Sequence, residues 1–202
     1  MIDLHYADDA LLVAEKPAGL LSVPGRTAEN QDCVVTRLQA LYPDALTVHR
    51  LDQVTSGLLL HARGKAMQAA LSAQFEQRQV YKRYVAVLEG MLDGEAGEVD
   101  LPLIVDWPNR PKQQVDHERG KPALTRWRVL TRAAGRTHVE LEPVTGRSHQ
   151  LRLHMASLGH PIVGDVLYGA QAAERVYLHA CVLRFTHPLS GEPMTFISPA
   201  TW

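Results

Sequence analysis

The 202-residue chain is poor in cysteine, with only Cys33 and Cys181, and neither belongs to a CxxC pair. This scarcity argues against a disulfide framework and against a zinc site built from cysteine pairs. No apolar run of the sequence approaches the roughly 20 residues that a membrane-spanning helix needs. The first residues are acidic and lack the basic-then-apolar order of a signal peptide, so we expect a cytoplasmic protein with no membrane partner.

Positive charge is not in excess either, because 21 Lys and Arg residues face 22 Asp and Glu residues, a net charge of −1. This balance argues against a protein that coats nucleic acid nonspecifically, although charges gathered on one face can still bind it. With 46% hydrophobic and 21% charged residues, the composition is that of an ordinary globular chain. The length suits one domain or two closely joined lobes, and we find no internal repeat.

Segments with the character of strands predominate. Apolar runs bounded by turn residues predict strands over residues 10–14, 46–51, 57–61 and 84–88, and a hairpin that joins 127–130 to 138–142. An acidic, glycine-containing loop is predicted at residues 93–98. This arrangement favours an α+β fold with a mixed, largely antiparallel central sheet and flanking helices.

Helical spacing is clearest in two segments. Apolar residues on one face predict a helix over residues 65–78. The second helix is predicted to begin at an N-cap formed by Ser148, to bury Leu151 and Met155, and to stop at Gly159.

The first segment with chemical potential is His49-Arg50-Leu51-Asp52, which is followed by Thr55-Ser56-Gly57 between two apolar stretches. A carboxylate held in a short turn is a candidate for general-base or nucleophilic work. The alternative is that Asp52 only hydrogen-bonds its own turn, as aspartates at strand ends often do. A protein kinase is excluded, because a leucine interrupts the HRD order and the chain has no Gly-rich phosphate loop.

The second segment, Thr145-Gly146-Arg147-Ser148-His149-Gln150-Leu151-Arg152-Leu153-His154, places two arginines and two histidines at the start of a predicted helix. A metal site is disfavoured, because histidines five residues apart do not share a helix face as those of HExxH do. A GxSxG elbow is disfavoured, because the second glycine is missing. Anion binding by helix amides and arginines and a merely solvated basic helix start both remain open.

Together with Lys82-Arg83-Tyr84 and His160-Pro161-Ile162-Val163-Gly164-Asp165, these blocks resemble the RluA family of pseudouridine synthases, in the family's order. The resemblance extends from residue 10 to the C-terminus. It implies one catalytic domain over residues 1–202, without a separate N-terminal RNA-binding module. It also implies isomerisation of uridine to pseudouridine in structured RNA, a reaction that needs no cofactor and no metal.

Two further stretches, residues 20–26 and 101–113, resemble the branch of the family that modifies two classes of RNA. The resemblance therefore implies two substrates, the anticodon loop of tRNA and a hairpin loop of 23S rRNA. We expect a monomer whose partner is RNA.

The resemblance also implies the roles of three catalytic residues. Asp52 is expected to be the nucleophile, and Arg152 to pair with it and favour its ionised form. Tyr84 is expected to stack on the uracil and to assist removal of the C5 proton, with Tyr81 as the alternative if the register differs. The alternatives without a catalytic role are that Arg152 is a surface arginine at a helix start and that Tyr84 is an ordinary core tyrosine of a strand.

Several basic side chains are candidates for RNA contacts. The resemblance implies that Arg50 enters the stack that the target base leaves, since a flat guanidinium stacks on bases. The other candidates are His49, Arg147, His149, Arg110 and Lys112. Two rival hypotheses are an RNA-binding or RNA-folding protein without catalysis, and a hydrolase that pairs Asp52 with Asp165.

Overall fold

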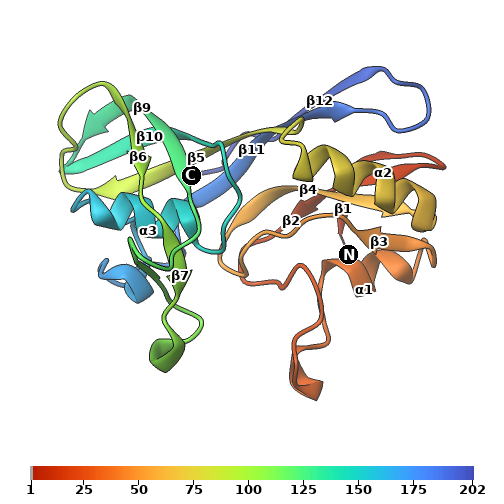
Figure 1. Cartoon of the computed structure of the whole chain (residues 1–202), viewed down its shortest axis with the longest axis horizontal. Helices are drawn as coiled ribbons and strands as arrows, with labels where there is room; N and C mark the ends of the chain where they lie inside the picture. Colours follow the sequence, from red (N-terminus) through yellow and green to blue (C-terminus); the bar gives the residue numbers. More distant parts are fainter. Residues whose placement is uncertain (1) are drawn as a thin grey trace. The chain divides into compact units, whose positions relative to one another are not determined.

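The computed structural model describes residues 2–202, and the chain forms two compact units (Figure 1). The first unit contains residues up to 82 together with 179–201. The second contains residues 83–178 and Trp202. The chain passes from one unit to the other within β5 (Tyr81–Glu89) and again at the first residue of β11 (Leu178–Thr186). The first unit is therefore assembled from two distant parts of the chain.

Strands of the first unit are arranged around β4 (Ser56–Arg63), which is buried along nearly its whole length. On one side β4 pairs with β2 (Leu11–Lys16), and β1 (Asp3–Ala7) pairs with β2. On the other side β11 pairs with the beginning of β4 and β3 (Ala45–Thr47) with its end. β12 (Pro193–Ile197) pairs with β11. Only the pairing of β4 with β11 is parallel among these.

Two helices and a 3-10 turn complete the first unit: α1 (Val34–Gln39), α2 (Gly64–Glu76) and η1 (Ala28–Asn30). The predicted helix at 65–78 is confirmed by α2, whose Leu71 is fully buried. Met67 and Phe75 of the same face pack against the core of this unit, which consists of Leu11, Val13, Leu58, Leu60, Ala62, Leu71, Val80, Leu183 and Phe185.

The second unit contains β5, β10 (Arg136–Pro143), β9 (Leu124–Ala133) and β6 (Ala96–Asp100), paired in that order and antiparallel throughout. A separate hairpin consists of β7 (Leu103–Val105) and β8 (Gln113–Val115), with the 3-10 turn η2 (Trp107–Asn109) at its tip. The helical elements are α3 (Gln150–Ser157) and η3 (Val166–Tyr168). The α+β fold with largely antiparallel pairing is confirmed.

The predicted hairpin is confirmed, and its turn has the backbone that the twist of two strands requires. Ala134 and Gly135 both have positive φ, at 52° and 72°. Positive φ at both central residues is the conformation of the tight turns that join twisted antiparallel strands. The strands are longer than predicted, because the β9–β10 pairing continues to the turn and β6 pairs with the beginning of β9 along its other edge.

Three predicted boundaries are wrong. The strand predicted at 46–51 ends at Thr47, where its pairing with β4 stops, and the Leu51 N–H bonds the Ser22 hydroxyl and not a strand. The loop predicted at 93–98 gives way at Ala96 to β6, where Arg126 of β9 forms an ion pair with Glu98 at 2.8 Å. The N-cap of α3 is His149 and not Ser148.

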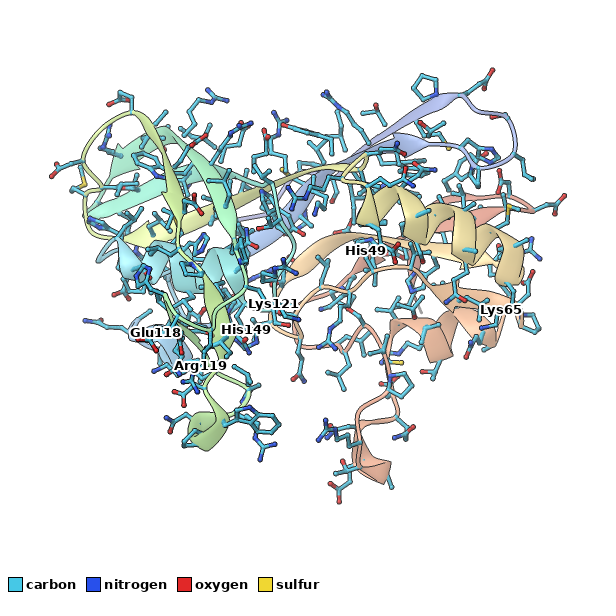
Figure 2. All side chains as sticks on the ribbon, viewed as in Figure 1. His49, Lys65, Glu118, Arg119, Lys121 and His149 are labelled. Atoms are coloured by element: carbon cyan, nitrogen blue, oxygen red, sulfur yellow. The ribbon has the colours of Figure 1, made fainter. Side chains whose placement is uncertain are left out.

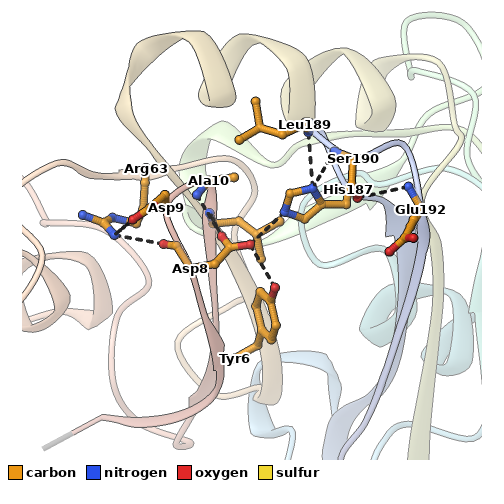
Figure 3. Close-up of polar contacts among 10 residues, drawn as sticks. Tyr6, Asp8, Asp9, Ala10, Arg63, His187, Leu189, Ser190 and Glu192 are labelled. Atoms are coloured by element: carbon orange, nitrogen blue, oxygen red, sulfur yellow. Dashed lines mark hydrogen bonds and ion pairs between the residues drawn. The ribbon is translucent and has the colours of Figure 1, made fainter.

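Asp8 connects the two distant parts of the chain that form the first unit (Figure 3). One carboxylate oxygen accepts hydrogen bonds from the backbone amides of Ala10 and Leu11 at 2.8 and 2.9 Å. The other accepts from the Tyr6 hydroxyl at 2.9 Å and from His187 Nε2 at 2.8 Å. Partial burial opposes ionisation, but the backbone amides and then His187 and Tyr6 outweigh it and lower the pKa of Asp8. The β1–β2 turn is thus fixed to the β11–β12 hairpin.

Candidate active site

The turn that carries Asp52 in the first unit is held on one side by a buried lysine. Lys16, the last residue of β2, is fully buried, and its Nζ donates to the backbone carbonyls of Pro17, Gln53 and Thr55 at 2.9, 2.9 and 2.7 Å. A buried ammonium is tolerated only when such acceptors replace water. Lys16 therefore fixes the backbone that follows Asp52.

The other side of the turn is held by Ser22. Its hydroxyl donates to the Leu51 carbonyl at 2.8 Å and accepts from the Leu51 N–H at 3.1 Å. The Thr55 N–H closes the turn by donating to the Asp52 carbonyl at 3.1 Å. Asp52 is half-buried. Backbone contacts therefore hold the turn rigid, and Asp52 is not fully buried in it.

The residues that follow Asp52 in the motif attach the turn to β11. Gly57 has a φ of +114°, and a Cβ there would overlap the backbone of Ala180, so only glycine is accommodated. His179 Nε2 donates to the Ser198 carbonyl at 3.0 Å, and its Nδ1 accepts from the Ser56 hydroxyl at 2.9 Å. The small residues of this motif are thus explained by close packing.

The two residues predicted as RNA contacts before Asp52 differ in their surroundings. Arg50 is exposed. His49 lies beside α2 (Figure 2), stacked on Phe75 with ring centroids 4.5 Å apart. Its Nε2 accepts a hydrogen bond from the Leu60 N–H at 3.0 Å. His49 thus has a structural role in the first unit, and its contact with RNA stays a prediction.

Burial keeps two histidines of the first unit neutral. It lowers the pKa of His49 to about 3, with further contributions from the charges of Lys82 and His61. It lowers the pKa of His61, on β4, to about 4. The Leu59 carbonyl favours the charged form of His61 slightly, but neither ring nitrogen makes a hydrogen bond of normal geometry.

We therefore expect the free energy of unfolding to fall as the pH drops below 6.5, the ordinary histidine pKa. The unfolded chain binds protons there that the folded protein does not, so this part of the stability is complete above pH 6.5 and is lost toward pH 4 and below. By pH 5 each histidine should cost about 2 kcal/mol. The free energy of unfolding should be measured by urea at pH 7 and at pH 5. Between these two pH values it should fall by about 2 kcal/mol less in His61→Leu than in the unaltered protein. Equal sensitivity of the two proteins would contradict the expectation.

Tyr84, in the second unit, is a buried residue of β5 and lies opposite Leu141 of β10. Tyr81, the alternative, belongs to the first unit, where the guanidinium of Arg184 lies 5.1 Å from its ring centroid. The two tyrosines thus have different surroundings, and the role of Tyr84 stays a prediction.

Arg152 is a buried residue of α3 with a carboxylate partner that the sequence did not predict. Its Nε and Nη2 donate to the two oxygens of Asp165 at 2.6 and 2.8 Å, and Asp165 is only 1% exposed. The guanidinium also lies 5.2 Å from the ring centroid of Tyr168. Such a two-point ion pair fixes the plane of the guanidinium. Gly164, which precedes Asp165, has a φ of +84°, and a Cβ there would overlap the backbone of Arg175. The close approach of these two segments therefore requires glycine.

His149 belongs to the same group of side chains. It adopts the left-handed conformation with a φ of 53°, which is uncommon for a residue with a side chain. Its Nδ1 is 2.8 Å from the Tyr168 hydroxyl, which also accepts from the backbone N–H of Gln113 at 2.9 Å. His149 is labelled in Figure 2. Arg152, Tyr168 and His149 therefore form one cluster in the second unit.

A buried glutamine fixes the Thr145–Arg147 turn before α3. Gln150 Oε1 accepts from the Thr145 hydroxyl at 2.7 Å and from the Arg147 N–H at 3.0 Å. Its Nε2 donates to Thr125 Oγ1 at 3.0 Å, and that hydroxyl in turn contacts His154 Nδ1 at 2.8 Å. Burial lowers the pKa of His154, which is therefore neutral at pH 7. The Gln150 side chain therefore holds the turn before α3, and among the described residues no side chain caps the helix.

The remaining predicted contact residues lie at the surface of the second unit. Arg147 is exposed, and its Nε donates to the Pro122 carbonyl at 3.1 Å. Arg110 is exposed and lies over the ring of Trp107. Lys112 Nζ is 6.0 Å from the ring centroid of Tyr168. All three keep donors that could reach an anion.

Within residues 2–202, no group of His, Cys, Asp and Glu side chains is arranged to hold a metal ion. Over the same residues, no helix has the length and apolar character needed to cross a membrane. Three residues of the site were missed as supports: Lys16, Asp165 and Tyr168. Of these, only Asp165 lies in one of the sequence motifs. The sequence pattern suggested it as the second carboxylate of a hydrolase and not as the partner of Arg152.

Comparison with known proteins gives a consistent result. Residues 10–157 match the family described as RNA pseudouridylate synthase. The chain is 52% identical over 200 residues to the dual-specificity RNA pseudouridine synthase RluA of Escherichia coli (strain K12), which covers 96% of this chain and 91% of that protein. It is 51% identical over 202 residues to the protein of the same name from Vibrio cholerae serotype O1, which covers 98% of this chain and 82% of that protein. The solved structure of human RNA pseudouridylate synthase domain containing 1 matches with a TM-score of 0.82 at 28% identity, covering 99% of this chain and 84% of that one.

Proposed function

The chain belongs to the RluA family of RNA pseudouridine synthases, enzymes that isomerise uridine in RNA, and we propose that Asp52 is the nucleophile of its reaction. The observation that carries this proposal is the turn around Asp52, which Lys16 and Ser22 hold by its backbone while Asp52 itself is only half-buried. A nucleophile needs this combination of fixed position and access.

The chemistry needs no electron acceptor. The bond between uracil N1 and ribose C1′ breaks, the base turns, and a bond forms between C5 and C1′. N1 gains a proton and C5 loses one, so the mass of the RNA is unchanged. Asp52 can act by bonding to the ribose carbon or by removing a ribose proton, and both routes need its ionised form.

Arg152 and Tyr84 are proposed to complete the catalytic group. A guanidinium favours the ionised form of a nearby carboxylate, and Asp165 keeps that of Arg152 in one orientation. The Tyr84 ring suits stacking on the uracil after the base has left its own stack. Arg50 is proposed to fill the vacated place, because a guanidinium stacks on neighbouring bases.

Two RNA classes are the proposed substrates, the anticodon loop of tRNA and a hairpin loop of 23S rRNA. The support is the name of the bacterial relatives, which are called dual-specificity enzymes, together with identity of 51–52% over nearly the whole chain. We place the protein in the cytoplasm, with these RNAs, as a monomer. Proposed phosphate contacts are made by Arg147, His149, Arg110 and Lys112, and His49 is proposed as a further RNA contact.

The test uses an anticodon stem-loop and a 23S hairpin that carry tritium at C5 of every uridine. We expect the protein alone, without cofactor, to release tritium to water from both RNAs. The reason is that the C5–tritium bond is replaced by the bond from C5 to ribose C1′. Mapping of the product should place one pseudouridine in each RNA. Tritium release from only one RNA would refute dual specificity, and tight binding without any release would support the rival of a silent RNA-binding protein.

A further inference from the structure

Trp107 is exposed, whereas the other aromatic residues described in the second unit are buried or half-buried. It lies in η2 at the tip of the β7–β8 hairpin and is 63% exposed. Large apolar side chains at such exposure often mark a binding surface when charged groups accompany them. Here the guanidinium carbon of Arg110 lies 4.4 Å from the centroid of the indole.

The hairpin tip is rigid before any ligand arrives. Asp106 N–H donates to the Lys112 carbonyl at 2.9 Å, and Lys112 N–H donates to the Asn109 carbonyl at 3.0 Å. Arg110 Nε donates to the Trp107 carbonyl at 3.1 Å, which holds the guanidinium over the ring. A fixed aromatic surface loses little conformational entropy on binding.

Charge at the tip favours an anionic partner. The carboxylate of Asp106, which precedes η2, accepts from Asn109 Nδ2 at 2.9 Å. Arg110 keeps its two terminal nitrogens as donors, and Lys112 adds a second cation. An indole that offers a stacking face beside cations has the features of a site for a nucleobase and its phosphate.

The hairpin is also attached to the cluster that holds Arg152. Gln113, the first residue of β8, donates its backbone N–H to the Tyr168 hydroxyl, and Tyr168 lies against the Arg152 guanidinium. A group bound at the tip is thereby fixed relative to a proposed catalytic residue.

We propose that Trp107 and Arg110 form a stacking platform for one unpaired nucleobase of the RNA substrate, distinct from the uridine that is isomerised. This proposal rests on the proposed function and adds a residue, Trp107, that selects RNA by the presence of a second unpaired base. The guanidinium covers one face of the indole, the base stacks on the other, and the arginine contacts the adjoining phosphate.

The test compares Trp107→Ala with the unaltered protein on whichever RNA releases tritium. Alanine should weaken RNA binding about tenfold, within the range for loss of one stacked base, whereas Trp107→Phe should retain most of the affinity. Leu189→Ala is the matched control, because Leu189 is 64% exposed and lies in the first unit, and it should bind normally.

The decisive measurement uses RNAs in which each unpaired nucleotide except the target is replaced in turn by an abasic one. For one abasic RNA, Trp107→Ala and the unaltered protein should bind equally, because the base that stacks is already gone. Emission of Trp107, measured after Trp127→Phe and Trp202→Phe, should be quenched by the intact RNA and not by that abasic RNA. A defect of the same size for every RNA, or no defect at all, would overturn the platform while tritium release left the proposed function standing.

Discussion

Asp52→Asn should lower the rate of pseudouridine formation by about 10⁴-fold or more, the scale on which loss of a nucleophile acts. An amide has nearly the shape of the carboxylate but is neither an effective nucleophile nor an effective base. RNA binding should be largely kept, because Lys16 and Ser22 hold the turn through backbone atoms that the substitution leaves in place.

Tritium release and RNA affinity should be measured on the same preparation. Asp9→Asn is the matched control, since the Asp9 side chain is fully exposed in the same unit and its removal should change neither quantity. An Asp52→Asn protein that turned over at a tenth of the normal rate would contradict nucleophilic catalysis by this residue. Loss of binding together with turnover would instead indicate a collapsed turn.

Asp165→Ala should destabilise the protein by about 3–5 kcal/mol, the usual cost of breaking a buried ion pair on one side. The reason is that Arg152 is buried and would keep its charge without the carboxylate that now satisfies two of its nitrogens. The loss should appear in urea unfolding at pH 7. Activity should fall as well, because the guanidinium would no longer have one orientation.

Glu98→Ala provides the comparison for this second prediction. Glu98 pairs with Arg126 at 2.8 Å, a distance similar to that of the buried pair, but both side chains are 55% exposed. Exposed pairs contribute about 0–1 kcal/mol, so this substitution should be nearly silent. Equal costs for the two substitutions would show that burial is not what makes the Asp165 pair important.

Local patterns predicted the parts of the fold that local physics decides. The helix at α2 and the stop at Gly159 follow from apolar spacing and from a residue with positive φ. β1 and β6 escaped prediction because each depends on a partner strand, β2 and β9, and has little apolar character of its own. Tertiary pairing, and not propensity, makes them strands.

The candidate site shows the same division. The motif around Asp52 was evident as a sequence, but its support was not, since Lys16 precedes the carbonyls that it binds by 37 and 39 positions. In the sequence that lysine resembled a polar end to a strand. The pairing of Arg152 with Asp165 was likewise hidden, because a carboxylate 13 residues away gives no periodic signal.

The path of the chain has a consequence for synthesis on the ribosome. Residues 83–178 emerge before β11, whose Ala180 packs on Gly57 and whose His179 bonds Ser56. A nascent chain can therefore fold residues 83–178 while β4, which follows Asp52, still lacks its pairing with β11. The protein should therefore become active only late in synthesis, when β11 pairs with β4 of the first unit.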